Sequence, residues 1–258
     1  MRHREPAICV RVSDWSETSQ VAEFFTRGQG IARVLAKGSK RPKSKTGGRI
    51  DLLAEGDLVW SGAGREGLGT LMEFTESASH NALRRDRPRL NAALYMLELV
   101  AAAMAENDPH PESFDLLHKA LARLAEQDAP AGAVLAYFQW RLLKQIGLLG
   151  DLTRCVRCGT ELAGRPAGWS FCSREGGLVC RGCAVPGEPR RPLDAAAPAA
   201  LAALAAAEAG RKAFLPEAQA RAANALLAYH VREQLGRPMR MARYVLGTGA
   251  CNCPKSCG

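Results

Sequence analysis

Two pairs of closely spaced cysteines constrain the fold of this chain more than any other feature. Cys155 and Cys158 form one C-x2-C pair, Cys180 and Cys183 form a second, and 21 residues lie between the pairs. A C-x2-C turn directs two sulfurs towards one point, so two such turns can supply the four ligands of a tetrahedral zinc site. The sequence therefore predicts a small metal-organised module at residues 153–185.

The ligand set indicates the role of the metal. Four thiolates fill the coordination sphere of zinc, so we expect one structural Zn²⁺ ion rather than a catalytic one. An iron–sulfur cluster or a redox dithiol is the alternative, and two matched pairs around a glycine-bearing hairpin favour zinc. The odd total of nine cysteines and their late clustering argue against a secreted disulfide framework.

The other cysteines carry weaker signals. We interpret Cys9 as a small apolar strand residue and Cys172 as a bystander of the metal module. Cys251, Cys253 and Cys257 form a second cluster in the tail. A tail without a defined role is the simpler interpretation of this cluster, and adventitious metal binding is the alternative.

The first 79 residues have the patterning of short strands. Apolar residues alternate or run together in six segments, which are Ile8–Val12, Val21–Phe25, Ile31–Lys37, Arg49–Leu53, Asp57–Trp60 and Leu68–Thr75. About five strands joined by glycine-bearing turns predict a small β-barrel. A helix over Glu17–Phe25 is the local alternative, because short apolar runs are ambiguous.

Helical periodicity replaces this pattern after Ser79. Apolar stripes with three-to-four spacing run over Leu90–Met104, Phe114–Leu124 and Leu135–Leu149, and helical composition returns at Asp194–Glu208 and Glu217–Leu235. The fold class is therefore α+β and multidomain. We expect a barrel domain at 1–79, a helical domain at 80–247 with the metal module inserted, and a disordered tail at 248–258.

A strongly basic segment follows the third strand. The chain carries a net charge of +9, and no acidic residue occurs between Arg33 and Arg49. A flexible basic loop beside a small β-barrel is suited to neutralising a phosphate backbone, whereas a solvated loop is the simpler alternative. The predicted DNA-binding residues are Arg33, Lys37, Lys40, Arg41, Lys43, Lys45 and Arg49. Trp15 lies in a polar stretch and is a candidate for base stacking, although core packing is the more common role of an aromatic residue.

Recognisable catalytic motifs are missing from the sequence. The five histidines are scattered, and the glycine–lysine order of a phosphate-binding loop is missing. We therefore expect a protein that is not an enzyme. No apolar run reaches about 18 residues and the start does not resemble a signal peptide, so we expect no membrane association and a cytoplasmic location.

The chain carries, in order, Ser16-Glu17-Thr18-Ser19, Phe25-Thr26 with Gly28 and Gly30, Ala36-Lys37-Gly38, Arg141-Leu142-Leu143 with Gly147, Cys155, Cys158-Gly159, Phe171, Gly176-Gly177, Cys180 and Cys183. Taken together, these residues resemble the RecO family of bacterial recombination mediators. The resemblance covers nearly the whole chain, roughly Ala7 to Gly236. Cys172 and the cysteine-bearing tail depart from the family pattern.

The resemblance implies a specific function. It implies an OB-fold at the N-terminus, a helical domain with a zinc module, and binding of single- and double-stranded DNA close to the nucleoid. It also implies annealing of strands coated with single-stranded DNA-binding protein, with RecR as a partner and RecA loaded indirectly. The alternative is a zinc-containing RNA-binding or ribosome-associated protein, because OB-folds bind either nucleic acid.

Overall fold

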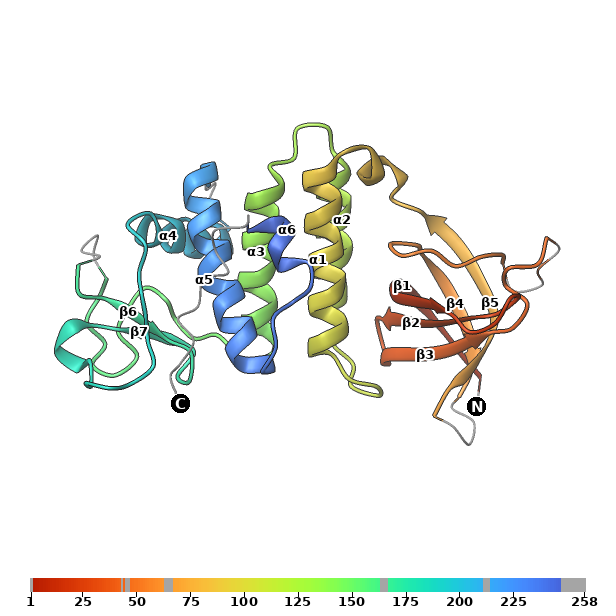
Figure 1. The fold of residues 1–258 in the computed structure, drawn as a ribbon, viewed down its shortest axis with the longest axis horizontal. Helices are drawn as coiled ribbons and strands as arrows, with labels where there is room; N and C mark the ends of the chain where they lie inside the picture. Colours follow the sequence, from red (N-terminus) through yellow and green to blue (C-terminus); the bar gives the residue numbers. More distant parts are fainter. Residues whose placement is uncertain are drawn as a thin grey trace. The chain divides into compact units, whose positions relative to one another are not determined.

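The computed structural model describes residues 2–42, 44, 47–62, 67–162, 167–210 and 214–246. Residue contacts divide the chain into two compact units, residues 1–127 and 128–258. The first unit holds the barrel and two helices, and the second holds the remaining helices and the cysteine module (Figure 1).

Five strands close the N-terminal barrel. They are β1 (Arg2–Asp14), β2 (Gln20–Thr26), β3 (Gly30–Ala36), β4 (Glu55–Ser61) and β5 (Gly69–Ala78). Their order around the barrel is β1-β2-β3-β5-β4, with β3 and β5 parallel and the other pairs antiparallel. Small five-stranded barrels with non-sequential strand order have the OB architecture, so the predicted barrel is confirmed.

The middle of strand β1, residues 7–10, is buried on both faces, which explains its continuous apolar run. Ala7 and Cys9 join Phe24, Leu58 and other residues in the barrel core. Ile8 and Val10 point to the opposite face and are also buried, because helix α1 (Arg87–Ala103) packs against β1. A strand covered on both sides loses the strict apolar–polar alternation of a half-exposed strand.

Two local expectations about the barrel are resolved. The helical alternative for Glu17–Phe25 is wrong, because β2 begins at Gln20 and pairs with both β1 and β3. The strand expected at Arg49–Leu53 is also wrong. This segment turns sharply, with Leu53 at a φ of 72°, and it contacts the barrel through the Leu53 N–H, which donates to the Cys9 carbonyl at 3.2 Å.

Helices α1 and α2 (Pro111–Ala125) belong to the same compact unit as the barrel. A short 3-10 helix, Asn81–Arg85, leads into α1, whose N-terminus is capped by Asp86 accepting the Arg89 N–H at 3.0 Å. The β2–β3 turn contacts the α1–α2 connection, where the Ile31 N–H donates to the Ala105 carbonyl at 2.9 Å. Gly30 permits this approach, because its φ is 68° and a Cβ there would lie 2.4 Å from that carbonyl oxygen.

Ionic and aromatic contacts also join α2 to the barrel. The Arg27 guanidinium lies 2.9 Å from the Asp115 carboxylate, and Phe25 packs on Phe114 with ring centroids 5.8 Å apart. His118 of α2 lies 2.5 Å from the Glu55 carboxylate, which also contacts His80 at 3.0 Å.

The second unit contains α3 (Ala131–Gln145), α4 (Ala197–Glu208), α5 (Glu217–Leu235) and α6 (Ala242–Val245). Helix α5 packs against α3 and α4. Buried polar groups set the α3–α5 contact, because Gln139 donates to Asn224 at 2.8 Å and Asn224 donates to the Gly132 carbonyl at 2.9 Å. Helix α5 ends at the expected position, before Gly236 in the left-handed conformation.

Between α3 and α4 lies the cysteine module. It contains β6 (Ser170–Cys172), β7 (Gly177–Val179), the 3-10 helix Arg181–Cys183 and β8 (Arg191–Pro192), in the sheet order β7-β6-β8. The expected domain limits at 79 and 247 remain a prediction. They follow the change in secondary-structure type, whereas the contacts group α1 and α2 with the barrel. The tail expected at 248–258 lies outside the described residues.

Candidate metal centre and nucleic-acid interface

Two backbone turns bring the four predicted cysteine ligands together. In the first turn the Gly159 N–H donates to the Cys155 carbonyl at 2.9 Å, and Gly159 supplies the required φ of 74°. In the second turn the Cys183 N–H donates to the Cys180 carbonyl at 3.1 Å. The sulfurs of Cys155, Cys158, Cys180 and Cys183 all lie within 4.8 Å of one another.

The arrangement fits a tetrahedral metal ion. A zinc–sulfur bond of about 2.3 Å gives a sulfur–sulfur separation of about 3.8 Å in a tetrahedron, and Cys158 Sγ lies 3.7 Å from Cys180 Sγ. None of the six cysteines in the described part of the chain forms a disulfide. The four-cysteine cluster can therefore hold a metal ion.

Hydrogen-bond donors around the sulfurs favour thiolates. The hydroxyl and backbone N–H of Thr160 lower the pKa of Cys158 to about 6. Burial raises the pKa of Cys155, but backbone N–H groups, that of Cys180 foremost, outweigh it and the net shift is downward. Hydrogen bonding with Cys158 and Cys180 raises the pKa of Cys183 to about 12. The pKa values of Cys155 and Cys158 are thus lowered while that of Cys183 is raised, and a bound cation would stabilise the thiolate form of every sulfur it contacts.

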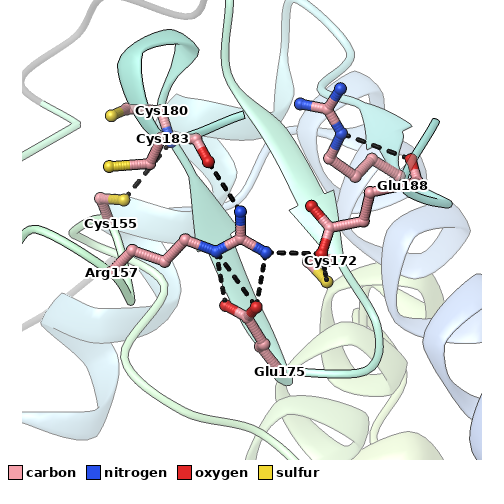
Figure 2. A network of polar contacts seen from close by, with 8 residues as sticks. Cys155, Arg157, Cys172, Glu175, Cys180, Cys183 and Glu188 are labelled. Carbon is pink, nitrogen blue, oxygen red and sulfur yellow. Dashed lines mark hydrogen bonds and ion pairs between the residues drawn. The ribbon is translucent and has the colours of Figure 1, made fainter. Parts of the chain in front are cut away.

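Arg157 links the two turns of the module. Its Nη1 donates to the Cys183 carbonyl at 2.6 Å, while its Nη2 donates to Glu175 at 2.6 Å and Glu188 at 2.5 Å. Figure 2 shows the guanidinium between these groups, with the sulfurs of Cys155, Cys180 and Cys183 gathered nearby. Arg157 therefore fixes the first turn relative to the second through its side chain.

His230 ties the module to the helices of its unit. This fully buried side chain of α5 lies 2.7 Å from the Ser173 hydroxyl and 2.7 Å from the Leu148 carbonyl oxygen. Burial lowers the pKa of His230, more than the Leu148 contact raises it, which favours the neutral ring. A neutral imidazole can donate from Nε2 to Leu148 and accept from Ser173 at Nδ1.

Cys172 lies apart from the four-cysteine cluster in its contacts. It is buried, and its Sγ lies 3.9 Å from a Glu188 oxygen in a group with Glu175. Arg157 already neutralises both carboxylates. The interpretation of Cys172 as a bystander stays a prediction.

One buried side chain, Gln20, contacts both ends of the segment that follows β3. Gln20 accepts hydrogen bonds from the Ser39 hydroxyl at 3.0 Å and the Ile50 N–H at 2.9 Å, and it donates to the Ile50 carbonyl at 3.1 Å. Both ends of the segment that follows β3 are therefore attached to the barrel, and we call this segment, residues 37–49, the basic loop. The Lys40 N–H donates to the Thr18 carbonyl at 3.1 Å, which attaches the loop to the β1–β2 turn.

The predicted DNA-binding residues differ in their surroundings. Lys37, Arg41 and Arg49 are exposed, and no salt bridge joins them to another described residue. Arg33 lies on β3 with its Nε 3.4 Å from Glu23, and Lys40 pairs with Asp14 at 2.9 Å. Lys43 and Lys45 lie outside the described residues.

Sequence analysis missed the groups that support both sites. Thr160, Arg157, Glu175 and Glu188 around the cysteines, and Gln20 beneath the basic loop, belong to no motif. The polar Gln20 at the start of an apolar strand was the one available signal.

Among the described helices, none combines the length and hydropathy of a membrane span.

Comparison with known proteins agrees with this architecture. Residues 1–78 match the family model described as "Recombination protein O N terminal", and residues 84–242 match "Recombination protein O C terminal". The chain therefore belongs to a class of recombination proteins with two parts. Here these parts are a small OB-like barrel and a helical region with a four-cysteine cluster. The chain belongs to the RecO family of DNA repair proteins.

Individual relatives support the assignment over most of the chain. A DNA repair protein RecO of Anaeromyxobacter dehalogenans (strain 2CP-1) is 32% identical over 254 residues, which are 95% of this chain and 96% of the relative. The DNA repair protein RecO of Salinibacter ruber is 34% identical over 151 residues, 58% of each chain. That of Synechococcus elongatus (strain PCC 7942) is 36% identical over 164 residues, 62% of this chain and 59% of the relative.

Proposed function

We propose that this protein binds single- and double-stranded DNA through the basic loop of its barrel and anneals complementary strands. The observation that carries the proposal is the loop itself. A stretch without acidic residues is held at both ends by Gln20, and its described cations Lys37, Arg41 and Arg49 are exposed.

The proposed mechanism is electrostatic. Two complementary strands repel each other through their phosphates, and a cationic surface that contacts both strands lowers this repulsion. Base pairing then supplies the free energy of annealing. The contacting residues would be Arg33, Lys37, Lys40, Arg41, Lys43, Lys45 and Arg49, within a DNA-binding domain at 1–79.

Membership of the RecO family supports the proposed partners. The strands would be coated with single-stranded DNA-binding protein, and the protein would act with RecR to help load RecA. Its place of action would be the cytoplasm, at the nucleoid. We propose no catalytic step, because strand annealing is driven by pairing and needs no bond cleavage.

A zinc ion would stabilise the helical domain at 80–247. Cys155, Cys158, Cys180 and Cys183 would hold one Zn²⁺ ion, which supplies cross-linking of the module rather than Lewis-acid chemistry. The sulfur separations and the N–H donors to Cys155 support this assignment.

A binding titration over salt concentration tests the DNA-binding proposal. Labelled single-stranded DNA, duplex DNA and RNA of one sequence would be titrated between about 50 and 200 mM salt. Four or five phosphate contacts predict a log–log slope of about −3 for single strands. A slope near zero would contradict the electrostatic account, and tighter binding of RNA would favour the RNA-binding alternative.

A further inference from the structure

The turn between β1 and β2 carries an exposed tryptophan. Trp15 is 60% exposed, whereas Trp60, Trp140 and Trp169 are 6%, 1% and 8% exposed. The turn is well defined, because the N–H groups of Trp15 and Ser16 both donate to the Ser19 carbonyl, at 3.0 and 3.2 Å. A large aromatic ring is thus held in solvent by an ordered backbone.

The Trp15 turn and the basic loop form one surface. Lys40 Nζ lies 2.9 Å from Asp14 Oδ2 and donates to the Ser16 carbonyl at 3.3 Å, so it contacts the residues on both sides of Trp15. A second link is the Gly38 N–H, which donates to the Ser19 hydroxyl at 3.2 Å. Strand pairing explains this proximity, since Asp14 pairs with Gln20 and Gln20 pairs with Ala36 at one end of the barrel.

Two acidic side chains also belong to this surface, the exposed Glu17 and Asp14, and Asp14 is neutralised. The Asp14 carboxylate would repel phosphate if it were unpaired. Its contact with Lys40 lowers the pKa of Asp14 and keeps the ion pair formed. Lys37, Arg41 and Arg49 remain as exposed cations of the basic loop, which contacts the tryptophan turn through Gly38 and Lys40.

We propose that Trp15 stacks on an unpaired base while Lys37, Arg41 and Arg49 bind the neighbouring phosphates. This inference rests on the proposed DNA binding and names the substrate form that the surface selects. Every base has an aromatic face, so stacking is tolerant of sequence, but a duplex covers those faces with neighbouring base pairs. Trp15 therefore makes the surface selective for single strands over duplexes.

Two readouts test the assignment with the full-length protein. The first is affinity for a single-stranded oligonucleotide and for the matching duplex, measured for wild type, W15A and W15F. Loss of one stacked base predicts about 5- to 150-fold weaker single-strand binding by W15A. Duplex binding by W15A should stay within about twofold, and W15F should retain most of the single-strand affinity.

The second readout is intrinsic fluorescence. Single-stranded DNA should quench the tryptophan emission of wild type and leave W15F unquenched, because the other three tryptophans are buried. Trp15 is exposed, so we expect all variants to unfold at the wild-type temperature. Unchanged single-strand affinity in W15A, or an equal loss for single strands and duplex, would overturn the stacking role. Absence of any DNA binding by wild type would overturn both this role and the proposed function.

Discussion

The side chain of Gln20 forms two hydrogen bonds with the backbone of Ile50, as a residue of a neighbouring β-strand would. The Gln20 amide donates to the Ile50 carbonyl at 3.1 Å and accepts the Ile50 N–H at 2.9 Å. The side chain of Gln20 is almost completely buried, so water cannot replace these bonds. The end of the basic loop is therefore held to the barrel by one residue, which also holds Ser39 at its beginning.

Replacing Gln20 by Ala should destabilise the first unit by about 1–3 kcal/mol. The change removes three hydrogen bonds and leaves the backbone groups of Ile50 buried without a partner. Denaturant unfolding measures the effect, and Q29A in the β2–β3 turn is the matched control. Equal stabilities of Q20A and Q29A would show that the anchor is not required.

Removing exposed charge from the basic loop should lower the salt dependence of single-strand binding. Each phosphate contact contributes about 0.7 to the slope of log affinity against log salt concentration. The triple variant K37A/R41A/R49A loses three cations, so this slope should change from about −3 to about −1. The control variant K119A/R123A/R154A removes the same number of positive charges outside the loop and should keep the wild-type slope. The same slope for both triple variants would assign the binding to total charge rather than to the loop.

Cys158→Ser should remove about one equivalent of zinc and destabilise the second unit. Loss of a structural metal predicts at least about 3 kcal/mol, or roughly 10 °C in the thermal midpoint. Metal analysis and thermal unfolding measure the two effects. The matched control is C172S, which should keep its zinc because Cys172 contacts Glu188 instead of the cluster. Loss of zinc from C172S would contradict the four-cysteine assignment.

Acidification should destabilise the second unit through His230. Its pKa in the folded protein lies below the ordinary value of 6.5, so the unfolded chain binds the proton more tightly. Stability is therefore complete above about pH 6.5 and falls as the pH decreases below it, by at most about 1.4 kcal/mol per pH unit.

Unfolding experiments between about pH 7.5 and 5.5 measure this dependence. The variant H230Q should have a flatter profile than wild type, and H110Q, which changes a half-exposed histidine of the first unit, is the control variant. Identical pH profiles for wild type and H230Q would rule out His230 as the titrating group.

The sequence was sufficient for local features and insufficient for long-range ones. The helix over Glu217–Leu235 and the four-cysteine cluster were both predictable, because periodicity, a glycine stop and C-x2-C spacing are local patterns. The turn at Leu53 was not predictable, since it depends on a hydrogen bond to Cys9, far away in the sequence. The supporting role of Arg157 depends in the same way on Glu175 and Glu188, which only the fold brings close.

Annealing of coated strands tests the central claim most directly. Complementary DNA strands, each saturated with single-stranded DNA-binding protein, would be mixed without ATP and with increasing amounts of this protein. The account predicts faster annealing, weakened by salt and lost in K37A/R41A/R49A. No acceleration by a folded, zinc-loaded protein would contradict it.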